Sequence, residues 1–214
     1  MIATSKGIVN RLSNSSKIID TTMGIILILL GAPGAGKGTQ AKMICKSNNL
    51  FHFSTGDILR NEVSKQTEVG KEIESIINSG RLVSDKIILK IVDKIISEEI
   101  SKNNGILFDG FPRNLDQANS FDKLLNEKEI KIDVVLHLLI KKDEIIKRIE
   151  KRQTEENRKD DNVEVLKSRI DVYFKETAPL IELYQQKGLL KEFDGMQTIE
   201  EVNNNINKSL GDVN

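Results

Sequence analysis

The sequence predicts an α/β fold in which buried parallel strands alternate with amphipathic helices, and two observations support this class. Short apolar runs recur along the chain and are continuous rather than alternating, which is typical of strands covered on both faces of a sheet. The segments between these runs carry polar and apolar residues at helical spacing. Strands that alternate with helices build a three-layer fold that binds ligands at the carboxyl ends of its strands.

The elements follow one another in this rhythm. The five expected strands are the apolar runs at residues 25–30, 50–53, 106–108, 134–140 and 189–193. The expected helices cover residues 39–47, 57–65, 86–101, 115–126, 143–151, 163–186 and 199–209. Two stretches interrupt the alternation, because residues 54–84 are longer than one crossover helix needs and residues 152–162 form a polar patch. Long segments beside a sheet edge often carry function, so both are expected to be mobile covers over a site.

The composition is that of a folded soluble protein. With 38% hydrophobic and 30% charged residues, the chain of 214 residues does not fit the disordered, collagen-like or disulfide-framework classes. Basic and acidic residues both total 32, so neither nucleic acid nor a membrane is an expected partner. No apolar run approaches the roughly 18 residues of a membrane-spanning helix. The single cysteine, Cys45, excludes an internal disulfide and suits a reducing compartment.

Residues 1–22 differ from the rest of the chain. They are rich in serine and contain Lys6, Arg11 and Lys17, with no acidic residue before Asp20. This composition leaves two interpretations: an organelle-targeting peptide, or a flexible extension before a functional start at Met23. The extension is preferred because the first strand begins directly after Met23, and it leaves a single domain over 23–214. A cytoplasmic location goes with the extension, and a mitochondrial or other organellar location with the targeting peptide.

The strongest motif is GAPGAGKGT, residues 31–39, between the first strand and the first helix. Its glycines let the backbone fold back so that consecutive N–H groups face phosphate oxygens, and Lys37 adds a charge for the terminal phosphates. The pattern is that of a P-loop, except that Gly38 stands where the generic motif has Ser or Thr. The hydroxyl comes one residue later, at Thr39, so its direct bond to magnesium is less secure. Asp109, at the end of the third strand, is expected to face the metal and its waters.

The placement of arginine gives the second clue. Only eight of the 32 basic residues are Arg, and a planar guanidinium can grip phosphate with two parallel hydrogen bonds, which Lys cannot do. Six arginines lie on segments near the expected ligand edge: Arg60, Arg113, Arg148, Arg152, Arg158 and Arg169. Arg11 and Arg81 are interpreted as ordinary surface residues, whose ion pairs contribute little stability.

Four motifs in order, GAPGAGKGTQ, STGDILR, DGFPRNLDQA and RKDDN followed by Arg169, resemble those of the adenylate kinases. The resemblance covers residues 23 to about 195. It implies a P-loop fold with a five-stranded parallel sheet, an inserted monophosphate-binding segment at about 54–84 and a short lid at about 152–162. Long-lid relatives carry an insertion that sometimes binds zinc; the chain lacks it, so no zinc is expected. Glu156 and Asn157 replace the Ser-Gly of many short-lid relatives, which leaves the flexibility of the lid open.

By this resemblance the chain is expected to transfer a phosphoryl group reversibly from Mg-ATP to AMP, giving two ADP. The implied catalytic residues are Lys37, Arg113, Arg152, Arg158 and Arg169. The implied ATP-binding residues are Gly34, Ala35, Gly36, Lys37, Gly38, Thr39, Arg148 and Arg152. Those implied for AMP are Thr55, Arg60, Val83, Gly110, Arg113, Gln117, Arg158 and Arg169. Mg²⁺ is the expected cofactor, held near Asp109 through water. The expected partners are ATP, AMP and ADP, and a monomer is expected.

The chemistry asks for no general base, because the attacking phosphate oxygen is already ionised near pH 7. His52 and His137 lie in strand-like runs and receive no role. The alternatives are a kinase of UMP/CMP or another nucleoside monophosphate, and a GTP:AMP phosphotransferase; Thr55 and Gln117 favour AMP by resemblance. A GTP-dependent switch would need an NKxD motif, and the NKSL at Asn207 lacks the Asp. A nucleotide-binding module without activity is disfavoured by the intact Lys and Arg set.

Overall fold

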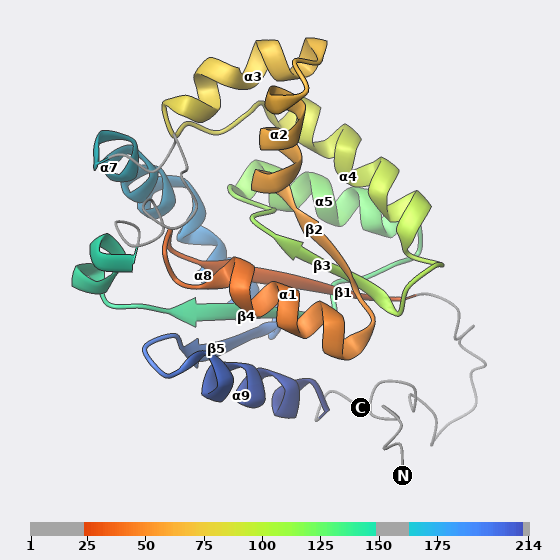
Figure 1. Cartoon of the computed structure of the whole chain (residues 1–214). Coiled ribbons are helices and arrows are strands. Elements are labelled where there is room, and N and C mark those ends of the chain that lie inside the picture. Colours follow the sequence, from red (N-terminus) through yellow and green to blue (C-terminus); the bar gives the residue numbers. More distant parts are fainter. Residues whose placement is uncertain (1–23, 149–162, 212–214) are drawn as a thin grey trace.

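The computed structural model describes residues 24–148 and 163–211. It confirms the α/β class, with a central sheet between two layers of helices (Figure 1). The expected extension at 1–22 and the expected lid at 152–162, with Arg152 and Arg158, lie outside the described residues.

The sheet has five parallel strands. Their bounds are β1 Ile25–Gly31, β2 Phe51–Ser54, β3 Gly105–Asp109, β4 Val134–Leu139 and β5 Leu190–Asp194. They pair in the spatial order β2-β3-β1-β4-β5, so β1 lies in the middle. Each strand begins and ends within one residue of the predicted run. β1, β3 and β4 are buried along most of their length, which leaves a continuous apolar signal, whereas β2 and β5 at the edges of the sheet are only partly buried.

Helices connect the strands. Their bounds are α1 Lys37–Asn48, α2 Thr55–Ser64, α3 Glu68–Asn78, α4 Asp85–Glu99, α5 Leu115–Glu127, α7 Val163–Val172, α8 Pro179–Gln186 and α9 Ile199–Gly211. A further helix covers 142–148 of the described residues. None of the helices in the described ranges is both long and apolar enough to cross a membrane.

The structure corrects two of the expected helices. The long inserted stretch holds a second helix, α3, whose Thr67 N-cap accepts a hydrogen bond from Gly70 N at 2.9 Å. The helix expected over 163–186 is interrupted by a π-helical turn, Tyr173–Thr177, in which Ala178 N bonds to Tyr173 O at 2.8 Å. Pro179 starts α8 directly afterwards, and a proline has no N–H to continue a helical ladder.

The two faces of the sheet carry separate cores. Along β1, Ile26 and Ile28 belong to a cluster with α4, α5 and α8, whereas Leu27 and Leu29 belong to a cluster with α1 and α9. Because side chains alternate along a strand, one apolar run fills both cores. Four phenylalanines of the first core, Phe53, Phe108, Phe111 and Phe121, pack with ring centroids 5.0–6.5 Å apart.

This layering decides where a ligand can bind. β1 continues into α1 on one face of the sheet, whereas the neighbouring β3 continues into α5 on the other face. Adjacent parallel strands whose connections leave to opposite faces open a crevice at their carboxyl ends. Gly31 and Asp109 therefore end their strands at the same crevice, with Leu29 and Asp109 in register.

We predict that Phe121→Ala lowers the free energy of unfolding by about 3–5 kcal/mol, because it leaves a cavity in the phenylalanine cluster. Phe121 is fully buried, and its ring centroid lies 5.0 Å from those of Phe108 and Phe111. Phe174→Ala is the matched control: this ring is 52% exposed and touches Tyr173, so its loss should cost about 1 kcal/mol or less. Urea unfolding measures both, and equal losses would contradict the assigned core.

Candidate active site

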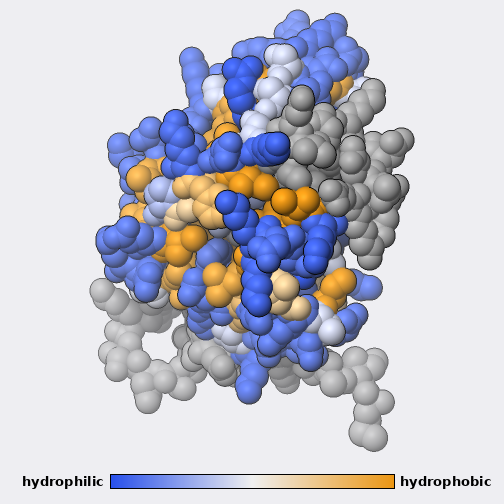
Figure 2. Space-filling model, turned by 90° about the vertical axis from the view of Figure 1, so that its left-hand side faces the viewer, coloured by the Kyte–Doolittle hydropathy of each residue, from blue (hydrophilic) through white to orange (hydrophobic). Residues whose placement is uncertain are grey.

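A cleft opens at the carboxyl ends of β1 and β3. Its main pocket has a volume of about 610 Å³, and a smaller pocket of about 50 Å³ adjoins it. Arg60, Arg113 and Arg169 line both pockets, so the three side chains lie at the junction between them. Figure 2 views the molecule from the side to which the arrow of β4 points in Figure 1. Hydrophilic residues dominate this face, and apolar residues show in patches near its middle.

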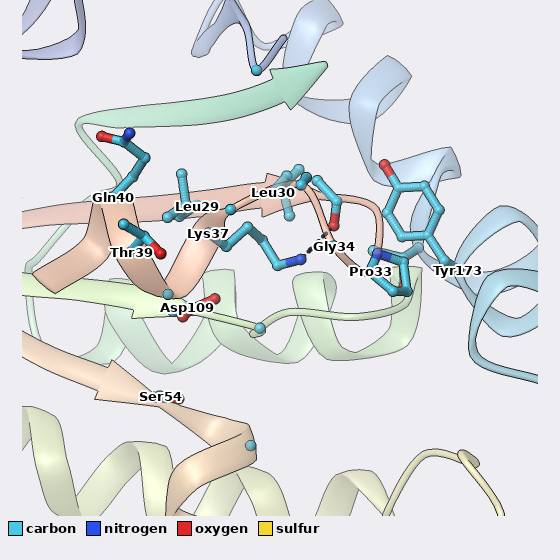
Figure 3. Close-up of a pocket in the computed structure, with 18 of the residues that line it drawn as sticks. Leu29, Leu30, Pro33, Gly34, Lys37, Thr39, Gln40, Ser54, Asp109 and Tyr173 are labelled. Atoms are coloured by element: carbon cyan, nitrogen blue, oxygen red, sulfur yellow. Dashed lines mark hydrogen bonds between the residues drawn. The ribbon is translucent and has the colours of Figure 1, made fainter. Parts of the chain in front are cut away.

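The P-loop forms one wall of the main pocket. Gly34 and Gly36 have φ angles of 80° and 90°, which favour glycine, and Gly36 caps α1 without a side chain. The first backbone N–H groups of α1 have no partner within the helix, so this end attracts anions. Lys37 Nζ lies 2.7 Å from Gly31 O and 3.0 Å from Ala32 O, which holds its ammonium group over the loop (Figure 3).

Asp109 faces the loop from the end of β3. Figure 3 shows Asp109, Thr39 and Lys37 around the same part of the pocket, which all three line. A Cβ added at Gly38 would lie 3.8 Å from Asp109 Oδ2, so the Ser or Thr of the generic motif would have its side chain beside this carboxylate. Gly38 has no side chain and cannot make this contact. The exposed Thr39 carries the only hydroxyl that follows Lys37 within the motif.

The oxygen atoms of Asp109 and Thr39 are donors that suit Mg²⁺. In the described part of the chain, no group of three or more His, Cys, Asp or Glu residues could hold a metal. An ion at this position would therefore take most of its ligands from phosphates and water, as Mg²⁺ commonly does. His52 received no role from the sequence, but its Nε2 lies 3.4 Å from Asp109 Oδ2 and can orient the carboxylate.

Three arginines from distant parts of the chain meet between the two pockets. Arg60 comes from α2, Arg113 from the loop after β3 and Arg169 from α7. Arg60 Nη2 bonds to Asp57 Oδ1 at 2.6 Å, and Arg113 Nε donates to Gly110 O at 2.7 Å.

The positive charges of these arginines repel one another. Burial lowers the pKa of Arg113 to about 10; the charges of Arg169 and Arg60 lower it too, against an opposing effect of Asp109. Neighbouring positive charges disfavour the charged form of the Arg113 guanidinium. An anion bound between the three arginines would favour the charged form instead. Phosphate matches guanidinium in charge and in its paired hydrogen bonds.

The smaller pocket is lined by polar side chains that are otherwise buried. Thr55 is 4% exposed and Gln117 is 2% exposed. Within the described ranges, Thr55 Oγ1 has no hydrogen-bond partner. Leaving a buried hydroxyl unpaired costs free energy, so a polar ligand atom in this pocket would be stabilising.

The described members of the predicted site all line the cleft. The main pocket contains Gly34, Ala35, Gly36, Lys37, Gly38, Thr39, Asp109 and Arg148. The smaller pocket contains Thr55, Arg60, Val83, Gly110, Arg113, Gln117 and Arg169. Arg148 Nε bonds to Glu144 Oε1 at 3.2 Å, which orients its side chain at the rim.

Other lining residues were missed by the sequence analysis. Arg81, interpreted as an ordinary surface residue, lines the smaller pocket, and its Nε donates to Ser79 Oγ at 2.9 Å. Tyr173 and Thr177 reach the main pocket because the π-helical turn places them there, and Thr177 Oγ1 donates to Arg113 O at 2.7 Å. The proline at 179 was the available signal for this break in the helix.

Comparisons with known proteins show which family the chain resembles. The family model described as adenylate kinase matches residues 29–189. An adenylate kinase of Prochlorococcus marinus is 46% identical over 184 residues, covering 86% of this chain and 97% of the relative. One of Parabacteroides distasonis is 41% identical over 187 residues, covering 87% and 98%, and one of Thermobifida fusca is 43% identical over 176 residues, covering 82% and 93%.

We predict that Cys45 does not react with thiol reagents in the native protein at pH 8. Burial, with the negative charge of Asp109, raises the pKa of Cys45 from 9.0 to about 12, so the thiol stays protonated far above pH 8. Only the thiolate is an effective nucleophile. A colorimetric thiol assay should find one reactive group after unfolding in guanidinium and none before. Rapid modification of the native protein would contradict the burial of this side chain behind the P-loop.

Proposed function

The chain belongs to the adenylate kinase family, and we propose that its two adjoining pockets hold the two nucleotides of the reaction with their phosphates facing each other. The reaction is reversible phosphoryl transfer from ATP to AMP, giving two ADP. The observation that carries the proposed arrangement is the sharing of Arg60, Arg113 and Arg169 between the pockets. Side chains that line both pockets can hold the donor and acceptor phosphates in line.

The main pocket is proposed to bind ATP. Its volume of about 610 Å³ lies within the range of roughly 300–1,000 Å³ usual for ligand pockets. The amides of residues 34–39 and the ammonium of Lys37 would hold the terminal phosphates, as the helix N-terminus of a P-loop does. Lys37 would then exchange its two loop carbonyls for phosphate oxygens. Arg148 would lie against the adenine, and Arg152, outside the described residues, near the phosphates.

The smaller pocket is proposed to bind AMP. Arg60 and Arg113 would grip its phosphate, and Thr55, Val83, Gly110 and Gln117 would surround the nucleoside. A volume of about 50 Å³ is too small for a nucleotide, so binding requires this pocket to widen. We propose that the monophosphate-binding segment at about 54–84, which contains α2 and α3, moves to make this space.

The chemical step needs positioning and charge neutralisation more than proton transfer. An oxygen of the AMP phosphate attacks the γ-phosphorus of ATP, the bond to the β–γ bridging oxygen breaks, and the leaving group is ADP. Lys37, Arg113 and Arg169 neutralise charge on the transferring group and keep donor and acceptor aligned. Mg²⁺ bound with ATP would add charge neutralisation at the phosphate oxygens, with the Asp109 carboxylate holding its water ligands.

Water competes with AMP for the phosphoryl group, so the site must close before transfer. By resemblance, Arg152, Arg158 and the lid at about 152–162 would cover the phosphates. These residues, like the extension at 1–22, lie outside the described ranges and stay proposals. We further propose that the chain works as a monomer in the cytoplasm, a reducing compartment that its single buried cysteine suits.

We predict that ADP forms from ATP fastest with AMP when AMP, UMP, CMP and GMP are compared as acceptors. Thr55 and Gln117 both line the smaller pocket, and by resemblance to the family they favour an adenine base. A coupled assay of ADP formation measures the panel, and a second series replaces ATP with GTP. Turnover of UMP or CMP as fast as that of AMP would refute the proposed acceptor.

We predict that Arg60→Ala raises the KM for AMP by about 10- to 100-fold and changes the KM for ATP much less, because a charge-assisted hydrogen bond contributes roughly 1.5–3 kcal/mol. Arg60 makes an ion pair with Asp57, so the fold should persist without it. Lys65→Ala, at an exposed position just after α2, is the control and should change neither constant. A larger effect on ATP than on AMP would refute the assignment of Arg60 to the acceptor phosphate.

A further inference from the structure

The side-chain amide of Gln117 is held at both of its ends. Its Oε1 accepts a hydrogen bond from the backbone N–H of Arg113 at 2.8 Å, and its Nε2 donates to Asp85 Oδ1 at 2.7 Å. Gln117 lines the smaller pocket, whereas Asp85 is not among the residues that line either pocket. Asp85 therefore contacts Gln117 from outside the pocket lining.

The two partners fix which way the amide faces. A backbone N–H can only donate, and a carboxylate can only accept. Turning the amide by 180° would place two donors together at Arg113 and two acceptors together at Asp85. Both groups of Gln117 would then be buried without partners, which is costly. The structure thus permits one orientation of the oxygen and nitrogen of this side chain.

The local structure keeps Asp85 in place. It is the first residue of α4, where the helix dipole favours a negative charge. Asn114 Nδ2 also lies 3.4 Å from Asp85 Oδ1, and Asn114 Oδ1 accepts from the backbone N–H of Gln117 at 2.7 Å. The N-termini of α4 and α5 are thus joined through these three side chains.

We propose that Asp85 is a positioning residue that makes the acceptor pocket select a 6-aminopurine over a 6-oxopurine, an inference that rests on the proposed function. With both fixed hydrogen bonds made, the Gln117 amide has one N–H and one oxygen lone pair left. A 6-aminopurine offers an N–H donor beside a ring-nitrogen acceptor, and the Gln amide pairs with adenine in this way. A 6-oxopurine has an oxygen in place of the amino group. Its 6-oxo acceptor would therefore face the Oε1 acceptor of Gln117, and no hydrogen bond could form between them.

The restraint is what turns this contact into selectivity. A freely rotating amide can reverse itself and serve either base. Here the reversal would break the bonds to Arg113 and Asp85, so the wrong base leaves polar groups unpaired whichever way the amide turns. Sites that leave a buried polar group unpaired reject the wrong substrate by large factors.

The experiment compares AMP with IMP, which differs in the 6-substituent and the N1 proton. We expect the wild-type chain to prefer AMP over IMP by at least about 1,000-fold in kcat/KM, given the polar-mismatch penalty. Asp85→Ala should lower this ratio at least tenfold, chiefly through a higher KM for AMP, and leave the KM for ATP unchanged. Asp85→Asn can still present an oxygen to Gln117 Nε2, so it should keep most of the ratio.

The matched control is Asp93→Ala on the same helix, because Asp93 bonds to Lys128 at 2.8 Å and lines neither pocket. Its ratio should equal that of the wild type. Thermal melting checks that each variant is folded. If Asp85→Ala does not fold, Asp85→Leu takes its place, because leucine cannot accept a hydrogen bond either.

An unchanged ratio in Asp85→Ala, or a parallel loss for AMP and IMP, would overturn the inference and leave the proposed function standing. A wild-type chain that fails to phosphorylate AMP would instead refute the proposed function itself.

Discussion

The repulsion among Arg60, Arg113 and Arg169 is the constraint on which the rest of the structure depends. Three cations meet at the junction of two pockets, and the pKa of Arg113 is lowered first by its burial and then by the charges of Arg169 and Arg60. Bringing like charges together is unfavourable unless an anion lies among them. The arrangement becomes favourable when phosphate lies among the guanidinium groups, so the site is built for a ligand with several negative charges.

The parallel sheet brings the residues that are proposed to act in catalysis to one place. Since β1 and β3 are neighbours whose helices leave to opposite faces, the P-loop and Asp109 end at one crevice. Arg113 follows β3, and the hydrogen bond from Thr177 to its carbonyl ties the π-helical turn, and with it α7 and Arg169, to the same edge. The two cores pack against opposite faces of the sheet, and α2 and α3 pack against the first of them (Figure 1).

Much of this could be predicted from the sequence where the signal is local. Continuous apolar runs located the strands, and the glycine spacing around Lys37 located the phosphate loop. The scarcity of arginine singled out Arg60, Arg113 and Arg169, which the fold places together, whereas it gave no reason to expect the exposed Arg81 beside the smaller pocket. The contact of His52 with Asp109 and the restraint of Gln117 by Asp85 join residues 57 and 32 positions apart, so no local pattern could reveal them.

The central claim is that one chain holds two nucleotides whose phosphates meet end to end at the three arginines. Calorimetric titration with a compound that joins two adenosines through five phosphates tests it most directly. The account predicts one molecule bound per chain, with ATP and AMP each competing against it. Binding of two molecules per chain, or competition by one nucleotide and not by the other, would contradict it.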